Sequence, residues 1–329
     1  MSGSRKGLEQ KIEALAALRR TADAKSAEAP LRKALADSSG FYVSKAAAQV
    51  EHFGLQSLAP DLVAAFDRLL DRDPVKSDPQ CWGKNALIGA LHTLGVRPAA
   101  PYLRGLRHVQ LEPVWGGQAD SAGALRGKCA LALVDSDLTP YQILTSLTGV
   151  LVDPDKQARL DAVRAVARVA QPESALLLRL KALTGDEHPD VMRECLLSLM
   201  TLAPAASIEL VPRYLSPENE LLCGDAAEAL ASARHPEALE ALLVFLRQRI
   251  PMTVRRSALL TLAASPLPEA GEYLLTVIAR DPTEAAGAAI TALGASRFRE
   301  EHRDRVAELV KSRGDEGLAA LFAAAFAPR

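Results

Sequence analysis

Small and apolar residues recur along the chain at the spacing that one packed face of an α-helix requires. Residues 191–199 and 254–262 carry them at the same offsets, which gives a register for the whole chain. The equivalent positions, called anchors here, are Val50, Leu91, Leu133, Val166, Leu199, Leu230, Leu262 and Leu293. By subtraction of residue numbers, successive anchors are 41, 42, 33, 33, 31, 32 and 31 residues apart. This repeat predicts about eight units of two helices each.

Prolines mark the expected helix starts at nearly the same phase of each repeat. Proline costs little in the first turn of a helix because its missing N–H would have no partner there, and a nearby carboxylate favours the positive end of the helix dipole. The prolines expected at or beside a helix start are Pro172, Pro189, Pro204, Pro217, Pro236, Pro266 and Pro282. Short breaks force antiparallel neighbours, so each unit is predicted to be a helix hairpin.

An acidic and a basic residue recur six positions apart inside the repeat, with the cation seven positions before the anchor. The pairs are Asp78 and Lys84, Asp120 and Arg126, and Asp153 and Arg159. In this pattern the sequence resembles the HEAT-repeat family, in which such residues form a structural ladder between adjacent repeats. The short periods are most similar to bacterial HEAT-like repeats, which also occur in phycobilin lyase subunits. The resemblance covers residues 41–296, and partly exposed rungs of this kind contribute only ~0–1 kcal/mol each.

The expected fold class is therefore all-α, a right-handed α-α superhelix of the HEAT-type solenoid class with terminal capping helices. It is expected to extend as a single elongated solenoid over residues 1–329. Its parts are an N-terminal cap at 4–37 that breaks near Ala22 and Asp23, longer irregular repeats at 41–153, regular repeats at 154–296, and a C-terminal cap at 297–329. The composition agrees, because 49% hydrophobic but only 4% aromatic residues suit closely packed helices.

Charge and cysteine usage narrow the function classes. Lys and Arg number 39 against 40 Asp and Glu, a formal net charge of -1, which weighs against a dedicated nucleic-acid binder. No apolar run reaches the ~18 residues of a membrane span, and no signal peptide is recognisable, so a cytoplasmic protein without a membrane partner is expected. The four cysteines are Cys81, Cys129, Cys195 and Cys223. They lack CxxC spacing and are expected to be reduced residues of the core.

The segment 111–120 is the largest departure from the repeat. Pro113, Gly116 and Gly117 exclude a helix there and place Trp115 on an irregular loop. Insertions in solenoids often build the binding site, so Trp82, Asn85, Trp115 and Gln118 from the two longest repeats are candidate partner-binding residues. The alternative is structural: Trp82 fills a gap beside the cap and Trp115 packs on its own loop.

The second helix of each repeat should line the concave face of the solenoid. Arg164, Arg193 and Arg256 occupy outward positions there and give the middle of the array a modest basic bias, which Glu194 and Glu228 oppose. These three arginines are further candidate binding residues. A phosphate track would need several uninterrupted cations with aromatic side chains between them, and the sequence lacks this pattern.

The sequence contains no catalytic motif. Gly-x-Ser-x-Gly, Gly-x-Gly-x-x-Gly and Walker sequences are absent, and no two histidines lie at the i, i+4 spacing of a helical metal site. We therefore expect no catalytic residues, no metal and no cofactor.

Three functional hypotheses remain. The first is a non-enzymatic scaffold, a monomer or weak dimer, that binds a protein partner on its concave face and on the 111–120 segment. The second is a DNA-binding protein or alkylpurine DNA glycosylase built on HEAT-like repeats, and the third is a lyase or chaperone-like subunit that acts on a prosthetic group. The last two follow from the family resemblance alone.

Overall fold

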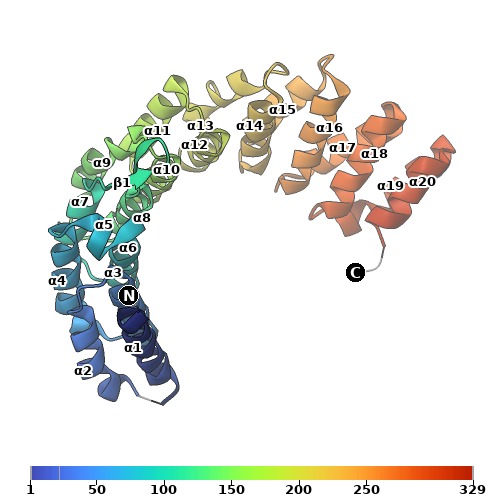
Figure 1. Cartoon of the computed structure of the whole chain (residues 1–329). Coiled ribbons are helices and arrows are strands. Elements are labelled where there is room, and N and C mark those ends of the chain that lie inside the picture. The colour runs from blue at the N-terminus through green and yellow to red at the C-terminus, as the bar shows by residue number, and fades with distance from the viewer. Residues whose placement is uncertain (1, 22, 328–329) are drawn as a thin grey trace. The chain divides into compact units, whose positions relative to one another are not determined.

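The computed structural model describes residues 2–21 and 23–327, which form 20 α-helices and one two-stranded β-hairpin (Figure 1). The predicted all-α class of stacked helix hairpins is confirmed. The helices pack into two compact units, Met1–Ser174 and Ala175–Arg329, and each is described by itself. The single continuous array remains a prediction of the sequence. Within the described residues, no helix is both long and apolar enough to cross a bilayer.

The first unit has two layers of helices. In one layer the second helices of successive repeats pack side by side in chain order: α3 (Gly40–Phe53), α6 (Trp82–Thr93), α8 (Gly123–Leu133) and α10 (Lys156–Val169) (Figure 1). The other layer holds α4 (Ala59–Leu70), α7 (Ala100–Leu106) and α9 (Pro140–Leu147). The remaining elements are α1 (Ser2–Thr21), α2 (Ala24–Leu35), η1 (Gln56–Leu58), α5 (Pro74–Ser77), η2 (Pro79–Cys81), β1 (Leu111–Val114), β2 (Gly117–Asp120) and η3 (Val150–Val152).

The N-terminal cap consists of α1 and α2, which both pack on α3. Asp23 is the N-cap of α2 and accepts a hydrogen bond from the backbone N–H of Ser26, so a new helix starts where the sequence predicts a break. Ala22, the other residue of the predicted break, lies outside the described residues.

The second unit repeats the two-layer arrangement. Its second helices, each packed on the next, are α12 (Pro189–Leu202), α14 (Glu220–Ser232), α16 (Met252–Thr261), α18 (Thr283–Ala295) and α20 (Glu316–Ala325). The opposite layer holds α15 (Pro236–Leu246), α17 (Pro268–Arg280) and α19 (Arg299–Arg313). The other elements are α11 (Pro172–Thr184), whose first residues belong to the first unit, α13 (Pro204–Ser207), η4 (Val211–Tyr214) and η5 (Leu262–Ala264).

All eight anchor positions of the repeat are buried, with no more than 2% of any anchor side chain exposed. Seven of them lie on second helices, and Leu262 begins the 3₁₀ turn η5 that follows α16. The register read from the sequence is therefore confirmed. Burial of these aliphatic side chains between the two layers provides the main favourable term in the stability of such a stack, because helices gain most of their stability by packing an apolar face.

Four of the predicted helix starts coincide with a proline: α11, α12, α13 and α15 begin at one. Two predictions are wrong. Near Pro217 the helix α14 begins three residues later, because the side chain of Asn219 accepts a hydrogen bond from the backbone N–H of Leu222 and caps the helix there. Near Pro266 the helix α17 begins at Pro268, which itself occupies the favourable first position.

Candidate functional site

Residues 111–120 form an antiparallel β-hairpin, so the expectation of an irregular loop is wrong. Leu111 of β1 pairs with Asp120 of β2, and Val114 pairs with Gly117. Trp115 and Gly116 make the two-residue turn, and Gly116 has a φ of 87°, which glycine adopts without steric cost. The glycines that exclude a helix thus close a tight turn that holds Trp115 at its tip.

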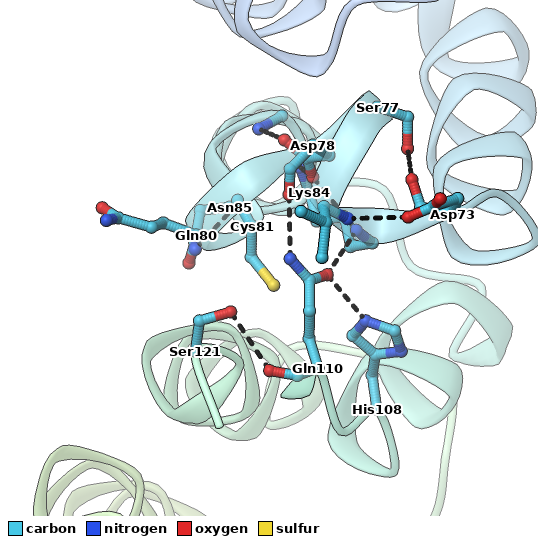
Figure 2. A network of polar contacts seen from close by, with 12 residues as sticks. Asp73, Ser77, Asp78, Gln80, Cys81, Lys84, Asn85, His108, Gln110 and Ser121 are labelled. Atoms are coloured by element: carbon cyan, nitrogen blue, oxygen red, sulfur yellow. Dashed lines mark hydrogen bonds and ion pairs between the residues drawn. The ribbon is translucent and has the colours of Figure 1, made fainter. Parts of the chain in front are cut away.

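Gln110, the residue before the hairpin, fastens it to the helices (Figure 2). Its side-chain N–H₂ donates to the carbonyl oxygen of Asp78 at 2.9 Å, and its Oε1 accepts from the ammonium of Lys84 at 2.8 Å. The Nε2 of His108 lies 3.3 Å from the same Oε1. Because an amide oxygen only accepts, this contact requires a proton on Nε2.

Asp78 and Lys84 form an ion pair inside the protein, with their charged atoms 3.1 Å apart and both side chains 0% exposed. The carboxylate also accepts from the backbone N–H groups of Gly83 at 2.6 Å and Lys84 at 3.1 Å. A Cβ atom on Gly40 would come within 2.3 Å of this carboxylate, so only glycine allows α3 to approach it. The expected partial exposure of the ladder is wrong at this rung, because α3, α6 and Gln110 enclose it.

Arg126 makes the next rung and joins the hairpin to the following repeat. Its side chain is 5% exposed, and its guanidinium lies 2.6 Å from the carboxylate of Asp120 at the end of β2. It also donates two parallel hydrogen bonds, of 2.6 and 2.7 Å, to Asp153. Arg159 donates to the backbone oxygen of Asp153 at 2.7 Å. This rung too is buried rather than partly exposed.

Glu112 on β1 ties the hairpin to the start of α6. Its Oε1 accepts from the backbone N–H of Gln80 at 2.6 Å, from the hydroxyl of Ser121 at 2.5 Å and from Gln110 at 2.7 Å. Burial acts to raise the pKa of Glu112, but the hydrogen bonds from Ser121, Gln110 and Gln80 outweigh it, and the pKa is lowered. The carboxylate therefore stays charged near neutral pH.

The turn that Glu112 holds is strained. Gln80 and Cys81 are consecutive non-glycine residues with φ of 56° and 54°. Each such residue costs of order 1–3 kcal/mol and persists only where the surroundings fix it. Besides the contact from Glu112, the side-chain amide of Asn85 donates to the carbonyl oxygen of Cys81 at 2.9 Å. The strained turn places Trp82, the next residue, at the surface.

A cleft of about 940 Å³ opens between the hairpin and the second-helix layer of the first unit. Its lining residues are Phe41, Ser44, Lys45, Ala48, Gln80, Trp82, Asn85, Ala86, Glu112, Pro113, Val114, Ala119, Ser121, Ala124 and Lys128. The indole of Trp82, 51% exposed, lies 5.2 Å from the ring of Phe41 between centroids. The ammonium of Lys45 lies 5.0 Å from the centroid of the same phenyl ring. Phe41 and Trp82 therefore make an apolar wall of the cleft, and Lys45 lies beside it.

The structure brings only some of the predicted binding residues together. Trp82 and Asn85 line the cleft, whereas Trp115 and Gln118 belong to the hairpin but not to the lining. Trp115 is fully exposed, so the alternative in which it packs on its own loop is wrong. Sequence reasoning missed Phe41, Lys45, Glu112 and Lys128. The repeat register could have indicated part of the lining, because Ser44 occupies the position of its repeat that is equivalent to Asn85, and both line the cleft.

The candidate arginines lie apart from this cleft. Arg164 on α10 is 3.5 Å from the carboxylate of its helix neighbour Asp161. In the second unit, Arg193 donates to both carboxylate oxygens of Glu228, at 2.9 and 2.5 Å. Arg256 lines a smaller pocket of about 270 Å³ in the second unit. Two of the three arginines therefore neutralise a neighbouring carboxylate.

Beside Arg193, the side chain of Asp225 on α14 is only 10% exposed, and burial raises its pKa to about 6 although Arg193 acts to lower it. The folded state then holds this proton more tightly than the unfolded state, whose pKa is near the usual 3.8. Stability from this group is present below pH 3.8 and is lost as the pH rises to about 6.

Replacing Asp225 by asparagine is expected to remove that loss. The difference in unfolding free energy, variant minus wild type, should rise by ~1–3 kcal/mol between acidic and neutral pH, and urea unfolding across this range measures it. Glu237→Gln, at an exposed position of the same unit, is the control and should leave the difference flat. If the difference in unfolding free energy for Asp225→Asn does not change with pH, the raised pKa of Asp225 is contradicted.

All four cysteines are buried and free, as predicted for core residues. Burial raises the pKa of the Cys81 thiol to about 11 and that of Cys195 to about 12. Thiols with such pKa values remain protonated near neutral pH and are poor nucleophiles. The cleft, which lies next to Cys81, thus gains no reactive thiolate from it.

No protein-family model matches the chain, and no curated protein matches it in sequence. Among solved structures, the crystal structure of Kap121p bound to Pho4p is similar, with 14% identity over 90% of this chain and 41% of that chain and a TM-score of 0.45. An engineered protein is similar with 16% identity over 88% of this chain and 81% of its own, at a TM-score of 0.35. The chain thus spans less than half the length of the first.

Proposed function

We propose that the chain is a non-enzymatic protein-interaction scaffold whose first unit binds a segment of a partner protein in the cleft beside the β-hairpin. The observation that carries the proposal is the half-exposed indole of Trp82, which lies against Phe41 in a cleft of about 940 Å³. A large aromatic side chain left in solvent at a concave surface is typical of an interaction site, because its burial by a partner contributes strongly to binding.

The hairpin adds a second contact surface at the edge of the cleft. Val114 is 51% exposed and Trp115 is fully exposed at the tip, although the hairpin base is held by Gln110, Glu112 and Asp120. An anchored base with apolar side chains in solvent suits binding, because little conformational entropy is lost when a partner covers a rigid surface.

The two alternative functions lack comparable support. Several of the cations that would form a basic groove are paired with carboxylates: Arg168 with Asp135, Arg193 with Glu228, and Arg255 with Asp281. A groove for duplex DNA needs cations free to contact phosphates. Among the described residues that line the cleft, none is an activated nucleophile or base for a lyase.

Trp82→Ala is expected to weaken the binding of peptide segments strongly. A random peptide library displayed on phage, selected on the immobilised full chain, should yield clones whose binding is lost in Trp82→Ala, with an expected loss of at least about tenfold in affinity. The chain contains two tryptophans, Trp82 and Trp115, so binding should also change its intrinsic fluorescence directly. Circular dichroism should confirm that the variant is folded.

Tyr141→Ala removes another exposed aromatic side chain from the first unit, outside the cleft, and should leave these clones bound. If the library yields no clone that distinguishes Trp82→Ala from Tyr141→Ala, the cleft is not a peptide-binding site and the proposal fails.

A further inference from the structure

We infer that the segment bound in the cleft is acidic and carries a large aromatic anchor. This inference rests on the proposed function and specifies the chemistry of the partner. It follows from how apolar surface, free cations and the one carboxylate are distributed around the cleft.

The apolar part of the cleft fits an aromatic anchor. Phe41 and Trp82 meet at an interplanar angle of 46°, and Pro113 and Val114 of the hairpin face the same cavity. Tilted rings leave an edge and a face open to a third ring, and such aromatic contacts add to the burial of apolar area. A large, flat side chain uses this wall better than a small aliphatic one.

Two cations of the cleft have no acidic partner among the residues that the structure describes. Lys45 on α3 and Lys128 on α8 are both exposed, and neither forms an ion pair with any residue that the structure describes. The ammonium of Lys45 lies over the face of the Phe41 ring, which carries no charge. In contrast, most other cations discussed above are neutralised by a neighbouring carboxylate. The two lysines are therefore available for the carboxylates of a partner.

Glu112 is the one acidic side chain in the lining, and its carboxylate is already engaged. Its Oε1 accepts three hydrogen bonds from within the protein, which hold the group at the base of the hairpin. Two lysines against one carboxylate leave the cleft positive by one charge, although the whole chain has a formal net charge of -1. Charge complementarity at this surface thus favours an acidic segment.

A protein segment fits these features better than a single-stranded nucleic acid. Nucleic-acid channels combine a continuous row of cations with separate aromatic rings on which successive bases stack. Here the two rings lie against each other, and Lys45 covers one face of Phe41. Two lysines on different helices suit two separate carboxylates.

The test is the composition of the phage clones selected on three proteins: the wild type, the double variant Lys45→Glu/Lys128→Glu, and the control Arg97→Glu. Only clones lost in Trp82→Ala are counted. On the wild type and on Arg97→Glu, whose reversed charge is exposed and outside the cleft, clones should be enriched in Asp and Glu around an aromatic residue. On the double variant the preference should change to Lys and Arg.

Affinities of a synthetic peptide complete the test. The most enriched wild-type sequence should bind about tenfold more tightly than the same peptide with Asp and Glu replaced by Asn and Gln, and added salt should reduce this difference. An oligodeoxythymidylate should not displace it.

Each contrary outcome has a distinct meaning. Clones that depend on Trp82 but show no acidic excess, or the same excess on the double variant, overturn the acidic partner and leave the peptide-binding function standing. Displacement of the peptide by the oligodeoxythymidylate overturns the acidic protein segment as the partner and favours a nucleic acid. A selection that yields no clones dependent on Trp82 overturns both the inference and the proposed function.

Discussion

Replacing Lys84 by methionine is expected to lower the free energy of unfolding by about 3–5 kcal/mol. Methionine matches the aliphatic part of lysine but leaves the carboxylate of Asp78 without its cation, at a site where both side chains are 0% exposed. Gln110 also loses the ammonium that its Oε1 accepts from, which weakens the base of the hairpin. Urea unfolding followed by far-UV circular dichroism measures the loss.

Lys128→Met is the matched control, because Lys128 is exposed and forms no ion pair among the described residues. Its effect should stay within about 0.5 kcal/mol. In the double variant Asp78→Asn/Lys84→Met the uncompensated charge is gone, and the amide oxygen still accepts from the backbone N–H of Gly83. At least half of the lost stability should return. If the double variant is no more stable than Lys84→Met, the charge is not the cause of the loss.

Arg126→Leu is the second variant with a large expected effect, again about 3–5 kcal/mol. The substitution removes the cation shared by Asp120 and Asp153, together with a hydrogen bond of 2.9 Å to the backbone oxygen of His108. Two buried or half-buried carboxylates then lack a partner, and the end of β2 loses its link to the next repeat. The same urea unfolding experiment measures this effect.

Two further variants separate geometry from charge. Arg126→Lys keeps the charge but cannot make the two parallel hydrogen bonds to Asp153, so an intermediate loss is expected. Arg104→Leu removes an exposed arginine that pairs with Asp67 in the same unit, and its cost should be within about 1 kcal/mol. Equal losses for Arg104→Leu and Arg126→Leu would show that burial of the rung has no energetic consequence.

The hairpin explains why residues 111–120 are not recognisable as strands from the sequence. Glu, Pro, Gly, Gln and Asp are uncommon in strands, and an isolated two-stranded hairpin is marginal in water. Its order comes from contacts with residues far away in the chain, above all Gln110 to Asp78 and Glu112 to Gln80. Local propensity contains no information about such contacts.

The cleft illustrates a similar limit at the level of side chains. Ser44 and Asn85 hold equivalent positions of the repeat, six residues before the anchors Val50 and Leu91, and both line the cleft. The register could not identify Phe41 or Lys45, because one turn of helix offers several exposed positions and only the hairpin decides which of them face a cavity. The strained turn at Gln80, which sets the position of Trp82, is likewise fixed by Glu112 from another element.

The sequence by itself determined the all-α repeat class, the eight anchor positions of the core and the spacing of the acidic and basic pairs. These features depend on periodic burial along helices, which is a local property of the chain. Only the tertiary structure decided that Asp78, Lys84 and Arg126 are enclosed, that Arg126 serves two carboxylates, and that a hairpin borders a cleft with two free lysines. Enclosure and charge pairing depend on which neighbours the stack brings together, and one helix period does not encode them.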